Sequence, residues 1–276
     1  MNLWLAVAIL AGADALAVGL MLALRRRSPI GSFFKDTAEA AGVFAVVGTA
    51  YAVLLAFVFF LAFQSYDGAR NDARDEADAT TSMFRTAGLF PSPGGARLQG
   101  QLICYGRAVA DLEWPAMRDG HANPVVQGWV ETIERTANGA PVRGDKPTAA
   151  LSHWFDLTEA RQAGRRGRLG EASSVVPPLV WFVLILGGVV VILYTCLFAD
   201  PAERHLSQSL MMLAVSTMVT SSLLVIYFLD HPYQNQSGSI RPTAVRTALR
   251  VIDAERARTR SLIALPCDPS GRPRAA

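Results

Sequence analysis

Residues 179–198 read LVWFVLILGGVVVILYTCLF and carry no charged side chain. A run of about 20 apolar residues is long enough to cross a hydrocarbon core of roughly 30 Å as a helix. Leu3–Leu24, Ala41–Phe63 and Leu206–Leu229 meet the same criterion, and Asp14 is the one charged residue within them. Four such runs in 276 residues leave too little polar chain to cover them in water. The sequence therefore predicts an all-α integral membrane protein with four transmembrane helices.

A long polar insertion separates the apolar runs into two pairs. Between Leu98 and Leu112, apolar residues recur at alternating spacings of four and three, which is typical of one helical face. Helices with such faces pack into bundles, so we expect an inserted extramembrane helical bundle. The predicted domains are a transmembrane hairpin at 1–63 (spans 3–24 and 41–63), a helical domain at 64–176, a second hairpin at 177–230 (spans 179–198 and 206–229), and an amphipathic helix with a disordered tail at 231–276.

Local signals predict where some of these helices begin and end. Asp36 and Glu39 have the spacing of a helix-start signal before the second span. This span is expected to continue beyond the membrane as an amphipathic stalk, up to the turn at Pro91–Gly95. Because proline disfavours helical geometry in the residue before it, Glu113-Trp114-Pro115 is expected to end a helix.

The distribution of basic residues bears on orientation. The first short connection holds Arg25–Arg27 and Lys35, which favours a cytoplasmic location for that loop. The inserted domain and both termini then lie outside the cytoplasm. Arginines beside the third span and after the fourth argue for the opposite arrangement, but long translocated domains are largely exempt from this rule. Outside the cytoplasm Cys104 and Cys267 could pair, whereas a cytoplasmic location predicts free thiols.

Composition and motifs exclude several classes of function. The net charge is +3 without a concentrated basic domain, so no nucleic-acid partner is expected. The cysteines and histidines lack metal-binding spacing, and the common nucleophile, phosphate-loop and dinucleotide signatures are absent from the sequence. We therefore expect no enzymatic activity, no cofactor and no metal, and a location in the cell membrane, specifically the bacterial inner membrane.

Asp14 is the sharpest functional candidate, since it lies near the middle of the first span. An ionisable side chain at that depth costs several kcal/mol and normally faces a bundle interior or water. It could serve an ion or proton relay, or it could simply hydrogen-bond a neighbouring helix. In the fourth span Ser209, Ser216 and Thr220 share one helical face, with Thr217 beside it. These hydroxyls could line a wet pathway or could join helices.

A second group of candidates is expected to have structural or interaction roles. Glu113 is predicted to form an ion pair with one of the arginines that precede the third span, and Trp114 to anchor packing at a bundle corner. Asp230 and Pro232 lie at the end of the fourth span. Capping of the helix and a sharp turn of the chain are sufficient to explain them. The complete group is Glu76, Glu113, Trp114, Arg161, Arg165, Arg168, Asp230 and Pro232.

An ordered set of short motifs resembles a family of bacterial membrane proteins called bestrophin-like. The set covers almost the whole chain. It departs from the family pattern in the longer stretch Tyr233–Gly238 and in the denser acidic cluster around Asp75. The motifs are Gly48-Thr49-Ala50-Tyr51, Asp75-Glu76-Ala77, Tyr105 followed by Glu113-Trp114-Pro115, the arginines Arg161, Arg165 and Arg168, Pro177-Pro178-Leu179-Val180-Trp181, and Asp230-His231-Pro232-Tyr233 with Gly238 and Pro242.

The resemblance implies kinship with bestrophins, which are pentameric anion channels with a long helical cytosolic part. The sequence contains no bestrophin pore signature, and the favoured orientation is inverted relative to theirs. By analogy we expect a homo-oligomeric ion channel or transporter-like protein in the lipid bilayer, with spans one and four lining a path near Asp14. The alternative is a membrane-anchored interaction protein whose helical domain, residues 64–176, binds an envelope or signalling protein.

Overall fold

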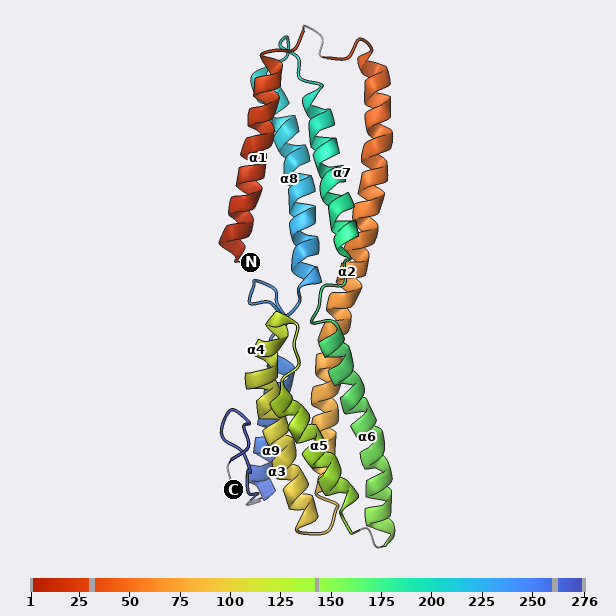
Figure 1. Cartoon of the computed structure of the whole chain (residues 1–276), viewed down its shortest axis with the longest axis vertical. Helices are drawn as coiled ribbons and strands as arrows, with labels where there is room; N and C mark the ends of the chain where they lie inside the picture. The colour runs from red at the N-terminus through yellow and green to blue at the C-terminus, as the bar shows by residue number, and fades with distance from the viewer. Residues whose placement is uncertain (1, 30–32, 142–143, 260–262, 275–276) are drawn as a thin grey trace. The chain divides into compact units, whose positions relative to one another are not determined.

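The computed structural model describes residues 2–29, 33–141, 144–259 and 263–274, and it divides into two compact units (Figure 1). The membrane unit comprises Met1–Ser65, Ser174–His231 and Asn235–Gly238. The extramembrane unit comprises Tyr66–Ser173, Pro232–Gln234 and Ser239–Ala276. Helix α2 contributes its first part to the membrane unit and its second part to the extramembrane unit.

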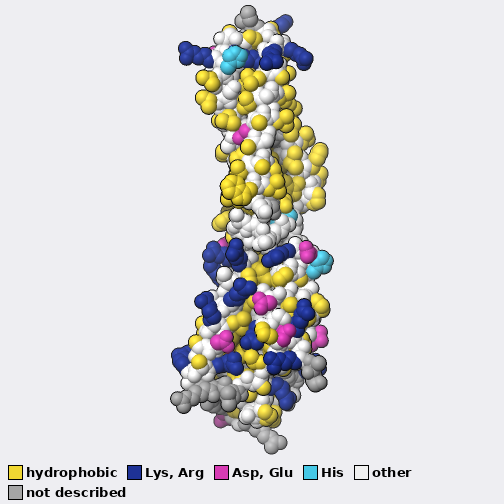
Figure 2. All heavy atoms as spheres, turned by 90° about the vertical axis from the view of Figure 1, so that its left-hand side faces the viewer, with side chains coloured by type: hydrophobic (Ala, Val, Ile, Leu, Met, Phe, Trp, Pro, Cys, Tyr) yellow, Lys and Arg dark blue, Asp and Glu magenta, His cyan; other side chains and the backbone are white. Residues whose placement is uncertain are grey.

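The membrane unit contains the four predicted spans. In the part of the chain that the structure describes, four helices are long and apolar enough to cross a bilayer, as the sequence predicts. Yellow apolar side chains cover most of the visible face of this unit and basic side chains lie at one end of it, whereas charged side chains of both signs are spread over the other unit (Figure 2). The four helices are α1 (Leu3–Arg25), α2 (Thr37–Ala87), α7 (Pro178–Cys196) and α8 (His205–Asp230).

Helix α2 is a single helix of 51 residues. Its start is fixed by Asp36, whose Oδ1 accepts hydrogen bonds from the amides of Ala38 and Glu39, both at 3.0 Å. Such a cap satisfies two of the free amides in the first turn. The second span thus continues without a break into the second part of α2.

Glycines in α7 allow a tyrosine of α2 to pack against its backbone. The Tyr51 hydroxyl donates to the carbonyl of Leu184 at 3.0 Å. A Cβ atom at Gly187 would lie 2.6 Å from the Tyr51 ring, and one at Gly188 would lie 3.0 Å from its hydroxyl. Any larger side chain at either position would displace the ring.

The end of α1 is tied to the connection between α7 and α8. Arg25 is buried, and its guanidinium donates to Gln208 Oε1 at 2.7 Å and to the carbonyl of Pro201 at 3.1 Å. It also donates to the carbonyl of Glu203. A guanidinium satisfied in this way holds the helix ends together at the point where the chain turns.

The extramembrane unit is the predicted helical bundle. Its core contains Leu98, Leu102, Ile133 and Trp154, which are all almost fully buried. The apolar face predicted from Leu98 onward lies in this core. Besides the second part of α2, the bundle consists of α3 (Gly94–Ala108), α4 (Trp114–Ala116), α5 (Pro124–Asn138), α6 (Asp145–Gly170) and α9 (Thr243–Thr259).

The helix expected to end at Glu113-Trp114-Pro115 does not end there. A π-helical turn over Val109–Glu113 joins α3 to α4, and a 3₁₀ turn follows to Asp119. The wider π-helical turn relaxes the i→i−4 bonding pattern, and proline tolerates the first turn of a new segment because its missing N–H has no partner there. Helical backbone therefore passes through Pro115.

The predicted disordered tail, which begins at Pro266, is also wrong for residues 266–274, while Ala275 and Ala276 lie outside the described residues. A disulfide joins Cys267 to Cys104 of α3. Trp129 Nε1 donates to the carbonyl of Gly271 at 2.6 Å, where φ is +84°. The polar, proline-rich composition gave no sign of this order, since the order depends on one covalent link and a few specific contacts.

Candidate functional site

The carboxyl group of Asp14 lies between α1 and α8 within the membrane unit. Its Oδ1 accepts a hydrogen bond from Ser216 Oγ at 2.5 Å, and its Oδ2 accepts one from Thr217 Oγ1 at 2.8 Å. Ser216 is fully buried, whereas Asp14 and Thr217 are half-buried. Each of the two carboxyl oxygens therefore accepts a hydrogen bond from one hydroxyl group of α8. The structure therefore brings together three of the residues that the sequence singled out.

The other two hydroxyl candidates belong to the same helix at greater distance along it. Ser209 lies about two turns before Ser216, and Thr220 lies about one turn after it. Both are half-buried. Among the hydrogen bonds of the described residues, neither donates to Asp14. The polar stripe of α8 thus extends along the helix from the Asp14 contact.

A second polar cluster lies in the interior of the extramembrane unit. Arg168, at the end of α6, donates to Glu76 of α2 through Nε at 2.6 Å and through Nη2 at 3.1 Å. The same Nη2 donates to Glu113 Oε2 at 2.7 Å. Arg168 and Glu113 are fully buried and Glu76 is 1% exposed. One guanidinium therefore joins α2, the π-helical turn and α6.

Arg165 completes the pairing of Glu113. Its Nη2 donates to Glu113 Oε1 at 2.7 Å, and its Nη1 donates to Gln127 at 2.8 Å. Burial by itself would raise the pKa of Glu113, but the hydrogen bond from Arg165 and the charge of Arg168 outweigh it and hold that pKa below its ordinary value. The predicted ion pair of Glu113 with the arginines of α6 is present, with two arginines rather than one.

Tyr105 belongs to this cluster, which the sequence reasoning missed when it assigned Tyr105 to an apolar face. Its hydroxyl donates to Glu76 Oε1. Burial raises the pKa of Tyr105, and the nearby charge of Glu76 raises it further. Tyr105 therefore stays protonated and acts as a donor. The sequence did contain a signal for this contact, because Tyr105 is part of the ordered motif set and a buried tyrosine hydroxyl needs a polar partner.

Arg161 differs from its two neighbours on α6. Its side chain is fully buried, and none of its three guanidinium nitrogens has a hydrogen-bond partner among the described residues. The guanidinium lies over the ring of Tyr105 at 4.9 Å from the centroid. A cation–π contact offsets only part of the cost of burying a charge. Three guanidinium groups and two carboxylates therefore share this interior.

Trp114 and Pro232 have packing roles in the same unit. The Trp114 ring lies 5.1 Å from the Arg168 guanidinium, and its Nε1 donates to the carbonyl of Ile240 at 3.0 Å. Pro232 is buried and its carbonyl accepts from the amide of Ile240 at 2.7 Å. The aromatic anchor and the proline turn thus fix the segment that leads into α9.

Asp230 closes the end of α8 in the membrane unit. Its Oδ1 accepts from the amides of Val175 and Val176 at 2.8 and 2.9 Å. Its Oδ2 accepts from Ser174 Oγ at 2.5 Å and Trp181 Nε1 at 3.3 Å. Asp230 is 1% exposed. These hydrogen bonds fix the chain just before α7, which agrees with a structural role for Asp230.

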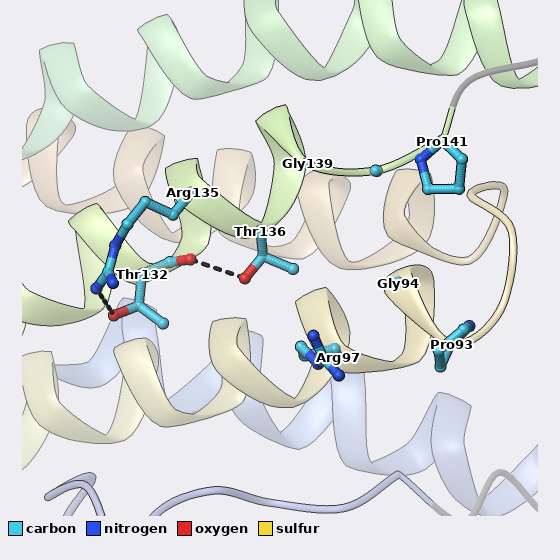
Figure 3. A pocket seen from close by; sticks show the side chains of 9 residues that line it. Pro93, Gly94, Arg97, Thr132, Arg135, Thr136, Gly139 and Pro141 are labelled. Atoms are coloured by element: carbon cyan, nitrogen blue, oxygen red, sulfur yellow. Dashed lines mark hydrogen bonds between the residues drawn. The ribbon is translucent and has the colours of Figure 1, made fainter.

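A polar depression of about 350 Å³ lies between α3 and α5 (Figure 3). Arg97 and Arg135 line it from the two helices. Arg135 donates to Thr132 Oγ1 at 3.1 Å, and Thr136 Oγ1 donates to the carbonyl of Thr132 at 2.9 Å, so these groups are engaged within α5. Across residues 2–29, 33–141, 144–259 and 263–274, no three His, Cys, Asp or Glu side chains are grouped to hold a metal ion.

The comparisons with known proteins agree with this architecture. The profile of the bestrophin-like domain matches residues 3–245. The chain belongs to the bestrophin-like family. A search of the curated proteins gave no match. The membership confirms the resemblance seen in the ordered motifs.

Solved structures of bestrophin homologues share the fold of this bestrophin-like protein. A mutant of a bacterial bestrophin homologue from Klebsiella pneumoniae superposes with a TM-score of 0.68 at 14% identity, over 88% of this chain and 98% of that chain. A crystal structure of a mutated membrane protein gives 0.66 at 14% identity, over 88% and 97%. Another structure of the Klebsiella pneumoniae homologue gives 0.65 at 12% identity, over 91% and 97%. At such identities the likeness concerns the fold alone.

Proposed function

We propose that this bestrophin-like protein is an oligomeric ion channel of the bacterial inner membrane and that Asp14 faces its pathway. The observation that carries the proposal is the half-buried carboxyl group of Asp14, held by Ser216 and Thr217 within a transmembrane helix pair. Membership of the bestrophin-like family supports the class of activity.

The energetics of this site favour a functional role over simple helix adhesion. Placing an aspartate at the centre of a transmembrane helix costs about 2.5–3.5 kcal/mol. Interhelical hydrogen bonds in membranes contribute on average about 0.6 kcal/mol each, so the two hydroxyl donors offset roughly 1 kcal/mol. The remaining cost is offset when the carboxylate contacts water or a cation, which a conducting pathway provides. Acidic side chains in such a pathway select cations.

The disulfide supports one of the two possible orientations. Disulfides form and persist outside the reducing cytoplasm. The Cys104–Cys267 bond therefore supports an extramembrane unit that faces the periplasm, with the short Arg25–Arg27 connection in the cytoplasm.

The proposal is tested by potassium flux into liposomes that contain the purified full-length protein. Wild-type protein should conduct, and Asp14→Asn should reduce the flux to that of protein-free liposomes. Ser222→Ala is a matched hydroxyl control on α8, because Ser222 Oγ bonds only to the carbonyl of Met218 within that helix, among the hydrogen bonds of the described residues. It should conduct like the wild type.

Two outcomes would reject the channel proposal. Equal flux in Asp14→Asn and wild type would remove Asp14 from the pathway. A wild-type flux no greater than that of protein-free liposomes would leave a membrane-anchored interaction protein, whose partner should be lost on deletion of residues 64–176.

A further inference from the structure

A basic pocket in the extramembrane unit has no role in the proposed channel. It encloses about 390 Å³, and three exposed arginines line it: Arg70 and Arg74 from α2, and Arg241 from the segment that precedes α9. The buried Ala73 gives the pocket a small apolar residue, and Ser239 adds a hydroxyl group. Three cationic side chains from two segments therefore converge on one concave surface.

The charged side chains that line this pocket are all basic. No acidic side chain lines it, and the three arginines form no ion pair with any residue that the structure describes. Arg74 donates to Asn71 Oδ1 at 3.3 Å. Asp67, in the turn before Arg70, accepts from Asn71 at 3.2 Å. The lining thus carries a positive formal charge, which suits an anion.

The position of Arg70 along α2 favours a phospholipid phosphate as the anion. Arg70 follows Phe63, the last residue of the apolar run, by seven residues of uninterrupted helix. At 1.5 Å per residue this separation is about 10 Å. The headgroup region adds roughly 5–7 Å to each side of the hydrocarbon core, and an arginine side chain can extend back toward it. Arg70 can therefore reach the phosphates of the adjacent leaflet.

We propose that this pocket binds the phosphate group of an anionic phospholipid through Arg70, Arg74 and Arg241. Guanidinium groups donate paired hydrogen bonds to phosphate oxygens, which makes arginine well suited to this ligand. Clustered basic residues beside a transmembrane helix bind anionic headgroups for the same reason. The site is independent of the proposed conduction through Asp14.

The test uses the full-length protein in detergent, titrated with phosphatidylglycerol, phosphatidylcholine or inorganic phosphate while binding is followed by microscale thermophoresis. Phosphatidylglycerol should bind, and phosphatidylcholine should bind much more weakly. Each arginine near an anionic lipid surface contributes roughly a fivefold change in affinity, so Arg70→Gln combined with Arg241→Gln should weaken binding about 25-fold.

A matched control separates this pocket from the general charge of the protein. Arg250→Gln removes an exposed arginine of α9 that does not line the pocket, and its affinity should stay close to that of the wild type. Equal weakening by Arg250→Gln, or no weakening by the double variant with its helix content intact, would overturn the proposal. Saturation by inorganic phosphate that phosphatidylglycerol cannot displace would overturn the lipid assignment in favour of a soluble anion.

Discussion

Two arginines of α6 offer a direct test of the interior polar cluster. Arg161 and Arg168 are both fully buried and lie two turns apart on one helix, but their partners differ. Arg168 donates to two carboxylates at 2.6–3.1 Å, whereas Arg161 has no hydrogen-bond acceptor among the described residues. Replacing each by methionine removes the same charge and keeps an unbranched side chain. The two variants should therefore change stability very differently.

The expected magnitudes follow from the contacts. Arg168→Met leaves Glu76 and Glu113 buried with one fewer cation, and breaking a buried ion pair costs about 3–5 kcal/mol. Arg161→Met loses a cation–π contact worth roughly 1–2 kcal/mol but also removes an uncompensated buried charge. We expect a change of less than about 1 kcal/mol, or a stabilisation.

Thermal unfolding in detergent, followed by tryptophan fluorescence, measures the difference. Each kcal/mol corresponds to about 2–4 °C for a domain of this size, so Arg168→Met should lower the melting temperature by about 10 °C. Arg161→Met should melt within a few degrees of the wild type. If Arg161→Met were as destabilising as Arg168→Met, Arg161 would have a strong partner and the assignment of charges in the cluster would be refuted.

Three further predictions concern other contacts of the same structure. The pKa of Glu113 lies below its ordinary value of 4.5, so ionised Glu113 stabilises the fold above pH 4.5 and this stabilisation is lost as the pH falls through the lowered pKa. Melting curves recorded between neutral and acidic pH should show this loss in the wild type, and Glu113→Gln should not show it. Asp230→Asn weakens the bonds to the chain before α7 and should cost about 2 kcal/mol, whereas exposed Asp253→Asn should melt like the wild type. Because Cys104 and Cys267 are buried, their thiols should react with maleimide in the denatured protein only after reduction, and reaction without reduction would place the unit in the reducing cytoplasm.

Patterns with a strong local physical cause could be predicted from the sequence. The four spans follow from runs of apolar residues, and their length is set by the bilayer. The start of α2 follows from the cap at Asp36, and its continuation follows from the lack of a strong helix breaker before Pro91. The division into two compact units matches the switch from apolar to charged composition along α2.

Features that depend on tertiary contacts could not be predicted in the same way. The sequence placed Tyr105 on an apolar face, because periodicity cannot show that a buried hydroxyl meets Glu76 from another helix. It placed a helix end at Pro115, because the π-helical turn that accommodates the proline has no periodic signal. Asp14 and the hydroxyls of the fourth span were named as separate candidates, but only the packing of α1 on α8 selects Ser216 and Thr217 as the partners of Asp14.

The most direct test of the proposed channel is the reversal potential of wild type and Asp14→Asn in a planar bilayer under a potassium chloride gradient. A carboxylate in the pathway predicts a wild-type current carried by potassium, with a reversal potential near the potassium equilibrium value. Asp14→Asn should lose the current, while Ser222→Ala should behave like the wild type. A chloride-selective wild-type current, or the same reversal potential in wild type and Asp14→Asn, would contradict the proposal.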